Sequence, residues 1–168
     1  DFIIICLPTP LNEKKEPDLS IVKNSLKSIT PFLRKDQTII LESTTYPGTT
    51  KELLLPIIEK SKLKVGKNIF LAFSPERINP GSKFPINKIP KIVGADDIKS
   101  LNKAKLVYNL IFQKVYLVNS SSVAEAVKLT ENIFRSVNIA LVNELKIIFD
   151  KMGIDIWDVI KLAKTKPF

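Results

Sequence analysis

Four polar residues in the last third of the sequence have the spacing of one helical face. At about 100° per residue, Glu125, Lys128, Asn132 and Arg135 fall within one quadrant of a helix. A cation, an amide and a guanidinium on one stripe could clamp a polar ligand. The alternative is a solvated stripe with ion pairs from Glu125 to Lys128 and from Glu131 to Arg135, and the spacing alone favours this alternative.

Two loops and one cysteine supply further candidates for chemistry. Glu76 follows a proline after an apolar run, where a carboxylate can act as a base or hold a water; an exposed loop acid is an equally good interpretation. The hydroxyls of Ser43, Thr44 and Thr45 could bind a ligand or cap the next helix, and alone they favour the cap. Cys6 lies in an apolar run, which predicts a buried and inert thiol.

The composition excludes several classes of protein. The 168 residues, 45% apolar and 26% charged, are typical of a globular protein with one domain, or one domain and an appendage. Histidine is absent, which excludes Ser–His and Cys–His catalysis. The single cysteine excludes an internal disulfide and argues against a zinc site. It fits a reducing compartment, so we expect a cytoplasmic protein.

Charge and hydropathy argue against nucleic-acid and membrane partners. The net charge of +9 comes mainly from lysines spread along the chain, and no stretch interleaves basic and aromatic residues as a stacking groove would. A lysine-rich solvated surface is the favoured interpretation, and it is compatible with weak attraction for an anionic small substrate. No apolar run approaches the roughly 20 residues of a membrane span, and the first residues do not have the pattern of a signal peptide.

The elements that must position the candidate residues alternate between strands and helices. Short β-branched apolar runs predict strands, and apolar residues at helical spacing predict helices between them. This alternation indicates an α/β fold with a parallel or mixed sheet and helices on both faces. The expected strands are residues 1–7, 37–41, 68–73, 91–94 and 114–118, and the expected helices are residues 18–33, 49–60 and 96–112.

Ligands of such folds bind beyond the carboxyl ends of the strands. The loops Pro8–Pro10, Ser43–Gly48 and Ser74–Gly81 all follow expected strands, which makes them candidate ligand loops. The run Asp1–Leu7 is continuously apolar after its first residue, which is typical of a central strand buried on both faces. We therefore expect the natural sequence to begin earlier.

A second type of structure follows residue 119. The sequence from Ser122 to Glu125 has the pattern of a capping box, which starts a long helix. Asp155 starts a second, shorter helix over 156–163. The first helix can continue for about 30 residues to Met152, with Gly153 as its stop. A helix this long needs partners on more than one face, so it suits a connector or a dimer interface.

One feature of dinucleotide-binding domains is absent. Such domains begin with a strand, a glycine-rich turn and a helix whose N-terminus holds the pyrophosphate. The five glycines of this sequence do not form that fingerprint. Spacing alone therefore predicts an α/β ligand-binding domain and no specific reaction.

Four motifs follow one another along the chain, and they are Ile5–Leu11, Leu41–Thr50, Phe73–Gly81 and Ala126–Glu144. Taken in order, these motifs resemble the UDP-glucose/GDP-mannose dehydrogenase family. Two of the motifs look most like the UDP-N-acetylglucosamine 6-dehydrogenase branch of that family. One is the turn Ser43–Gly48, called the hydroxyl turn below, which ends in tyrosine–proline–glycine, and the other is the loop from Ser74 to Gly81. The resemblance covers essentially the whole chain, and the order of the motifs makes it specific.

The resemblance implies a fold and an activity. We expect residues 1–119 to be the C-terminal part of a Rossmann-like NAD-binding domain, and 120–168 to be a central helical region that forms a homodimer. In that family a UDP-sugar is oxidised at carbon 6 from alcohol to carboxylate, two hydrides pass to two NAD molecules, and a cysteine holds the intermediate. We expect a UDP-N-acetylhexosamine substrate and a role in capsule, O-antigen or other surface polysaccharide biosynthesis.

The resemblance also implies roles for particular residues. Thr44 and Glu76 are expected to position the catalytic water and assist proton transfer, and Lys128 with Asn132 to stabilise the oxyanion at carbon 6. Further residues match motif positions near the cofactor or the substrate. These are Pro8, Thr9, Ser43 and Thr44 for NAD, and Glu76, Arg77, Lys128, Asn132 and Arg135 for the sugar nucleotide.

The departures from the family are missing parts. Its glycine fingerprint and ribose-binding acid would lie before Asp1, and its nucleophilic cysteine beyond Phe168, so Cys6 is not that nucleophile. We therefore expect this chain alone to have no dehydrogenase activity; turnover of a UDP-sugar by the pure chain with NAD would contradict this. There are alternatives for the substrate and for the class of protein. The substrate could be UDP-glucose or UDP-ManNAc. The chain could instead belong to another NAD(P)-dependent dehydrogenase, such as a hydroxyacid dehydrogenase, or be a non-catalytic dimerisation or binding module. We expect no metal.

Overall fold

The computed structural model describes residues 1–78, 81 and 83–167. It divides the chain into two compact units, Asp1–Leu129 and Thr130–Phe168, which are considered separately. The first unit contains the five strands and all the helices that precede α4, and helix α4 begins in it. Its elements are β1 (Phe2–Ile5), α1 (Ser20–Ile29), η1 (Thr30–Phe32), β2 (Thr38–Leu41), η2 (Thr50–Leu54), α2 (Leu55–Ile58), β3 (Phe70–Phe73), η3 (Ile86–Lys88), β4 (Lys91–Gly94), α3 (Ile98–Asn109), β5 (Val115–Val118) and the start of α4 (Ser121–Lys151).

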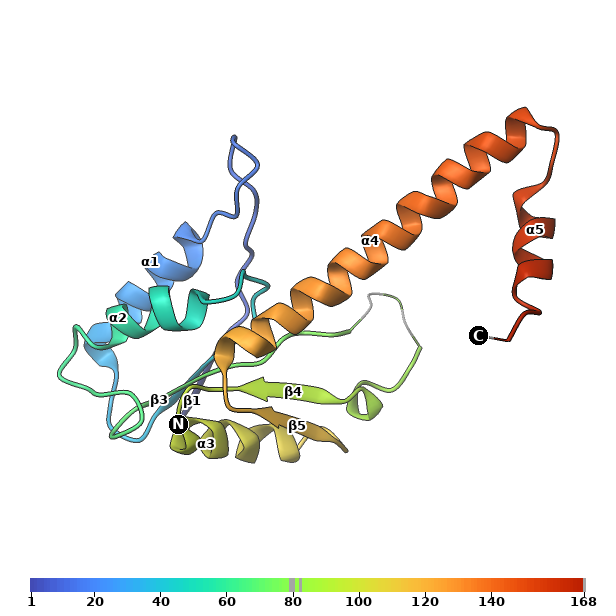
Figure 1. Cartoon of the computed structure of the whole chain (residues 1–168). Helices are drawn as coiled ribbons and strands as arrows, with labels where there is room; N and C mark the ends of the chain where they lie inside the picture. Colours follow the sequence, from blue (N-terminus) through green and yellow to red (C-terminus); the bar gives the residue numbers. More distant parts are fainter. Residues whose placement is uncertain (79–80, 82, 168) are drawn as a thin grey trace. The chain divides into compact units, whose positions relative to one another are not determined.

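The strands form one mixed sheet in the order β1-β2-β3-β4-β5 (Figure 1). β1, β2 and β3 run parallel, with Ile3 beside Ile39 and Ile39 beside Leu71. β4 runs antiparallel to β3, and β5 runs parallel to β4. The predicted α/β fold with a mixed sheet is confirmed. Because β1, β2 and β3 share a direction, the loops that follow them meet at one edge of the sheet.

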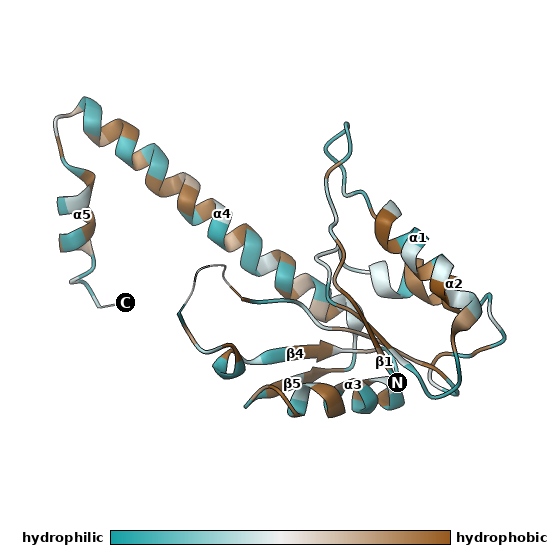
Figure 2. Cartoon of the chain, turned by 180° about the vertical axis from the view of Figure 1, so that it is seen from behind, coloured by the Kyte–Doolittle hydropathy of each residue, from teal (hydrophilic) through white to brown (hydrophobic). Residues whose placement is uncertain are grey.

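The two faces of the sheet carry separate apolar clusters. One face packs against α1, η2 and α2, and its buried residues include Val22 and Leu26 of α1 and Ile58 of α2. The other packs against α3, where Leu101 and Tyr108 are buried. Alternate strand residues therefore serve opposite faces, as the period of two in a strand requires. Figure 2 shows these strands as a largely apolar centre of the unit.

β1 is less buried than the sequence predicts. It pairs with β2 alone among the described strands and lies at one edge of the sheet. Phe2 and Ile4 are 40% and 43% exposed because α3 packs on the other strands. The expectation that Asp1–Leu7 is a strand buried on both faces is therefore wrong for the structure of this chain. An apolar run predicts that a strand can be buried, but its actual burial depends on which elements cover it.

Prolines shorten two of the expected helices. Helix α1 gives way to the 3₁₀ turn η1, where Pro31 cannot donate the next helical hydrogen bond. The segment expected as a helix over 49–60 contains Pro56, and it folds as a π-turn followed by one short α-helical turn. Asp18, one residue before the N-cap Leu19, accepts from the backbone N–H of Ser20 at 2.8 Å.

The start of α4 is fixed to the α/β unit by polar contacts. Ser120 caps the helix, with its Oγ accepting from the N–H of Val123 at 3.3 Å. Glu125 is fully buried, and its carboxylate accepts from Gly48 N at 2.6 Å, Thr50 N at 2.8 Å and Thr50 Oγ1 at 2.7 Å. The predicted capping box of Ser122 and Glu125 is therefore wrong, because the carboxylate turns toward the hydroxyl turn instead of its own helix N-terminus.

A close backbone approach reinforces this joint. A Cβ on Gly94, the last residue of β4, would lie 2.5 Å from the carbonyl oxygen of Ser120 and 2.6 Å from the Cβ of Ala124. Only glycine leaves room for α4 at that distance. The end of β4 and the first turn of α4 are therefore packed too tightly for any side chain between them.

The second unit contains the rest of α4 and helix α5 (Ile156–Ala163). Gly153 follows α4 with φ +72, the left-handed conformation that ends a helix, as predicted. Asp155 caps α5 by accepting from Trp157 N at 2.8 Å. Many apolar residues of α4, such as Phe134 and Val137, are exposed, and the colouring of Figure 2 shows hydrophobic positions along the length of the helix. Among the described residues, no helix is long and apolar enough to cross a membrane.

The buried Glu125 carboxylate generates a stability prediction. Glu125→Ala leaves three buried donors without an acceptor, so the free energy of unfolding should fall by at least about 2 kcal/mol. Chemical denaturation of the purified protein measures this. The control is Glu144→Ala, which removes an exposed acid from the same helix; equal losses for both variants would contradict the assignment.

The same carboxylate predicts a pH dependence. Burial raises the pKa of Glu125 above its ordinary value of 4.5, although the hydrogen bonds from Thr50 and Gly48 oppose the shift. The folded state therefore binds the proton more tightly than the unfolded state. The free energy of unfolding should fall as the pH rises from about 4.5 to the folded pKa, and Glu125→Ala should lack this component. An unchanged slope in the variant would contradict it.

Candidate functional site

A pocket of about 400 Å³ lies where β1, β2 and β3 end. Two of the predicted catalytic residues, Thr44 and Glu76, line it together, although they lie in different loops. The parallel direction of the three strands explains why, because it gathers their carboxyl ends at one edge. The lining residues are Cys6, Leu7, Glu42, Ser43, Thr44 and Glu76.

Hydrogen bonds between the first two loops set the shape of this pocket. The buried Ser43 hydroxyl accepts from the N–H of Leu7 at 2.8 Å and donates to the carbonyl of Leu7 at 2.7 Å. The Thr9 hydroxyl donates to the carbonyl of Thr44 at 2.8 Å. Ser43 thus holds the loops together, while the Thr44 side chain stays exposed on the pocket rim. Pro8 lies exposed in the same first loop.

Glu76 has a fixed orientation at the pocket. Its Oε1 accepts from the backbone N–H groups of Arg77 at 2.6 Å and Ile78 at 2.7 Å. Its side chain remains 44% exposed. The Arg77 guanidinium donates to the carbonyl of Pro90 at 2.7 Å, which ties the loop to the segment before β4. Asn79 and Pro80, which belong to the same sequence motif, lie outside the described residues.

A buried polar cluster lies beside this pocket and was missed by the sequence analysis. Lys91, 3% exposed, lies 2.9 Å from Glu42 Oε1 and 3.6 Å from Glu76 Oε2. The Tyr108 hydroxyl donates to Glu42 Oε1 at 2.5 Å. One signal was available: a lysine that opens a short apolar strand must find a carboxylate when the strand is buried.

Cys6 does not occupy the environment that the sequence predicts. It follows β1 and is exposed at the pocket, where its Sγ lies 3.5 Å from Glu42 Oε2 as a hydrogen-bond donor. Partial burial of the thiol, followed by the charge and hydrogen bond of Glu42, raises its pKa. The expected buried position is therefore wrong, and the raised pKa keeps the sulfur protonated and weakly nucleophilic.

A second, more apolar pocket of about 210 Å³ adjoins the hydroxyl turn. Thr45 lines this pocket and is buried, with only 6% of its surface exposed. Its hydroxyl has no hydrogen-bond partner within the described part of the chain. An apolar pocket with one unsatisfied buried hydroxyl can accept a planar ligand that has a polar edge. The lining residues are Thr9, Leu11, Pro17, Thr44, Thr45, Tyr46 and Leu129.

The candidate residues of α4 fall in both units. Lys128 belongs to the first unit, is half-buried, and follows the anchored Glu125 by three positions. Asn132 is half-buried and Arg135 exposed in the second unit. The burial of Glu125 separates it from the solvated stripe that spacing alone favours, because its carboxylate is bound to Gly48 and Thr50.

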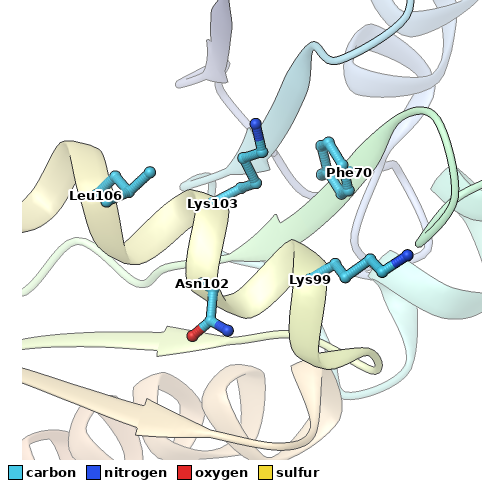
Figure 3. A pocket seen from close by; sticks show the side chains of 5 residues that line it. All are labelled: Phe70, Lys99, Asn102, Lys103 and Leu106. Carbon is cyan, nitrogen blue, oxygen red and sulfur yellow. The ribbon is translucent and has the colours of Figure 1, made fainter.

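Another pocket, of about 290 Å³, has no motif residue in its lining. Figure 3 shows Lys99, Asn102, Lys103 and Leu106 projecting from α3 beside Phe70 of β3. The Lys103 ammonium lies 5.2 Å from the centre of the Phe70 ring. We assign this pocket no ligand. Within the described residues no group of three or more His, Cys, Asp or Glu side chains could hold a metal ion.

Comparison with known proteins identifies the chain's relatives. Residues 1–112 match the NAD binding domain of the UDP-glucose/GDP-mannose dehydrogenase family, and residues 122–168 match its central domain. Protein CapL of Staphylococcus aureus is 43% identical, and a UDP-N-acetyl-D-glucosamine 6-dehydrogenase of Pseudomonas aeruginosa is 42% identical; each alignment covers 99% of this chain and 40% of the relative.

The structural comparison agrees. A UDP-D-ManNAc dehydrogenase from Pyrococcus horikoshii superposes with a TM-score of 0.90 at 33% identity, over 99% of this chain and 40% of that one. The chain spans about 40% of the length of the relatives that it matches. Both comparisons confirm the predicted resemblance, and the chain belongs to the UDP-glucose/GDP-mannose dehydrogenase family.

Proposed function

We propose that this chain is part of an NAD-dependent enzyme that oxidises carbon 6 of a UDP-N-acetylhexosamine to the carboxylate. One observation carries the proposal: in a member of this family, the two loops that bear Thr44 and Glu76 line one pocket at the strand ends. Relatives named for UDP-N-acetylglucosamine and UDP-N-acetylmannosamine both match the whole chain, so the isomer stays open. We further propose that the enzyme is cytoplasmic and serves the synthesis of a surface polysaccharide.

The chain's own residues suggest a division of labour. Glu76, held by two backbone N–H groups and half-exposed, would orient a water at the pocket and take its proton. Thr44 on the rim would hold the same water. Lys128 and Asn132 would stabilise negative charge on the oxygen at carbon 6, because a fixed cation in a dry site interacts strongly with developing charge. Arg77 and Arg135 would contact the substrate or its surroundings.

The residues at the hydroxyl turn fit part of a dinucleotide cofactor. The apolar pocket beside Thr45, with its orphaned hydroxyl, suits a planar ring with a polar edge. We propose that Pro8, Thr9, Ser43 and Thr44 form this end of an NAD site, with Ser43 acting by shaping the loop. Bound NAD would supply the hydride acceptor, and two NAD molecules in turn would take the two hydrides of the oxidation. The protein's part there is to exclude water and to orient the sugar's carbon 6.

The first test is NADH formation by the complete gene product with UDP-GlcNAc, UDP-ManNAc and UDP-glucose. We expect two NADH per sugar oxidised, and a kcat/KM higher for an N-acetylated sugar than for UDP-glucose. Absorbance at the NADH band and mass analysis of the product measure both quantities. No NADH with any of the three sugars would contradict the proposed function, and a preference for UDP-glucose would contradict the substrate class.

The proposed role of Glu76 can be tested by one substitution. Glu76→Gln keeps the shape but removes the proton acceptor, so kcat should fall about 100-fold or more, the usual contribution of a general base. KM for the sugar should change little, because the amide still fills the same space. The matched control is Glu59→Gln, which alters an exposed acid at the end of α2. Equal kcat values for wild type and Glu76→Gln would exclude the role.

We also propose that the complete protein forms a homodimer through α4. The part of α4 in the second unit exposes many large apolar side chains, Phe134 to 71% and Val137 to 60% among them. A helix with this much exposed apolar surface is unstable in water without a partner. A second copy of the same helix supplies a matching apolar surface, as two-fold interfaces require.

Charge placed on that surface should disrupt the dimer. Phe134→Glu combined with Val137→Glu buries two carboxylates in the proposed interface, so the molar mass should fall to that of a monomer. Light scattering coupled to size-exclusion chromatography measures it. Leu110→Glu, at an 86% exposed position at the end of α3, is the control and should leave the mass unchanged. A wild-type protein that is already monomeric would refute the proposal.

A further inference from the structure

The Lys91 ammonium has an unusual position for a lysine. Its side chain is 3% exposed, at the first residue of β4. Two aromatic rings lie near the ammonium, with ring centres at 5.0 Å for Tyr108 and 5.4 Å for Phe112. A buried ammonium is retained where it is paired with negative charge. The two carboxylates beside it, Glu42 at 2.9 Å and Glu76 at 3.6 Å, supply that charge.

The two oxygens of Glu76 have different partners. Oε1 is held by the N–H groups of Arg77 and Ile78, so the loop itself fixes one side of the carboxylate. Oε2 is the atom that faces Lys91. The torsion about the last bond of a glutamate side chain has a broad preference, so the orientation of the carboxylate plane depends on the partners of both oxygens. A cation on the side of Oε2 restricts that rotation from a second direction.

Lys91 is in turn held from behind. Glu42 Oε1 lies 2.9 Å from the ammonium and also accepts the Tyr108 hydroxyl at 2.5 Å. Tyr108 is 2% exposed in the packed face of α3, so the position of its hydroxyl is set by the core. The chain of contacts therefore runs from the core, through Tyr108 and Glu42, to Lys91 and Glu76.

We propose that Lys91 is a positioning residue of this site, which orients the Glu76 carboxylate toward the pocket and offsets the combined negative charge of Glu42 and Glu76. The inference rests on the role of Glu76 in the proposed function. Lys91 acts through Glu76 and does not need to touch substrate or cofactor. A single cation shared by two carboxylates explains why one strand begins with a buried lysine.

Cys6 offers a readout of this charge balance that is independent of turnover. The groups that face its thiol are Glu42 from β2, Lys91 from β4 and Glu76 from the loop after β3. Burial, and then Glu42, raise the pKa of the thiol, Lys91 lowers it, and Glu76 adds a smaller increase. Removing Lys91 should therefore raise the pKa of Cys6, whereas removing the charge of Glu42 should lower it.

The first experiment measures alkylation of Cys6 by iodoacetamide between pH 7 and pH 10 in the complete gene product, followed by mass analysis of the Cys6 peptide. Because only the thiolate reacts, we expect Lys91→Met to slow the reaction about 3- to 10-fold at pH 8, and Glu42→Gln to accelerate it. Lys99→Met, the same change at an exposed position of α3, should match wild type. Equal rates for wild type, Lys91→Met and Glu42→Gln would overturn the proposed charge arrangement.

The second experiment asks whether Lys91 acts through Glu76. Lys91→Met should lower kcat about tenfold with the sugar KM nearly unchanged, and Lys91→Arg should restore part of the loss. In a Glu76→Gln background, Lys91→Met should have almost no further effect, since the group that it positions is gone. A purely structural lysine would lower kcat by the same factor in both backgrounds, which would overturn the proposal. Lys91→Gln replaces Lys91→Met if the apolar variant does not fold.

The two experiments separate this inference from the proposed function. If Glu76→Gln retains full activity, the assigned role of Glu76 fails, and with it the positioning role, whatever the alkylation rates show. If Glu76→Gln loses activity while Lys91→Met has wild-type kcat, the proposed function stands and the role of Lys91 is wrong.

Discussion

The buried carboxylate of Glu125 is the interaction on which the arrangement of the site depends. An ionised carboxylate cannot stay in a core without hydrogen-bond donors. Here the donors are the backbone N–H groups of Gly48 and Thr50 and the hydroxyl of Thr50. These donors belong to the segment that follows Thr44 on the pocket rim. The same bonds therefore fix the rotation of α4 about its axis, and with it the position of Lys128 one turn further along. A single acid couples the hydroxyl turn to the helix that carries the next candidate residue.

The strand ends depend on a second balance of charge. Two acids, Glu42 and Glu76, reach the same edge of the sheet because β2 and β3 run parallel. Their repulsion is offset by Lys91, which arrives from the antiparallel strand β4. A fully parallel sheet would place the start of β4 at the opposite edge, and the ammonium could not reach both acids. The change of direction between β3 and β4 is thus what gives this edge its cation.

Much of this structure could be predicted from the sequence. Apolar runs and turn residues located the strands and helices, and the parallel connections placed Thr44 and Glu76 at one edge. Burial was harder to predict, because it depends on which element covers a residue. Phe2, Ile4 and Cys6 share an apolar run yet are exposed. Glu125 has the local pattern of a capping box, but three donors more than 70 residues away in sequence hold it instead. Lys91 opens a short apolar strand, which signals that it needs a carboxylate, but only the fold shows that Glu42 is this carboxylate and that Tyr108 shares it.

Gly94 has no side chain, and the close packing that this allows limits how segments can be exchanged between related proteins. Ser120 and Ala124 pack directly against this glycine, so the surface of β4 and the first turns of α4 must match each other atom by atom. The compact first unit accordingly runs through to Leu129. A chimera between two relatives that joins them at residue 119 would pair a β4 and an α4 of different origin, and it would also separate Glu125 from its donors. A junction after residue 129 keeps these contacts within one parent, so chimeras made there should fold more often than those joined at the apparent boundary in sequence.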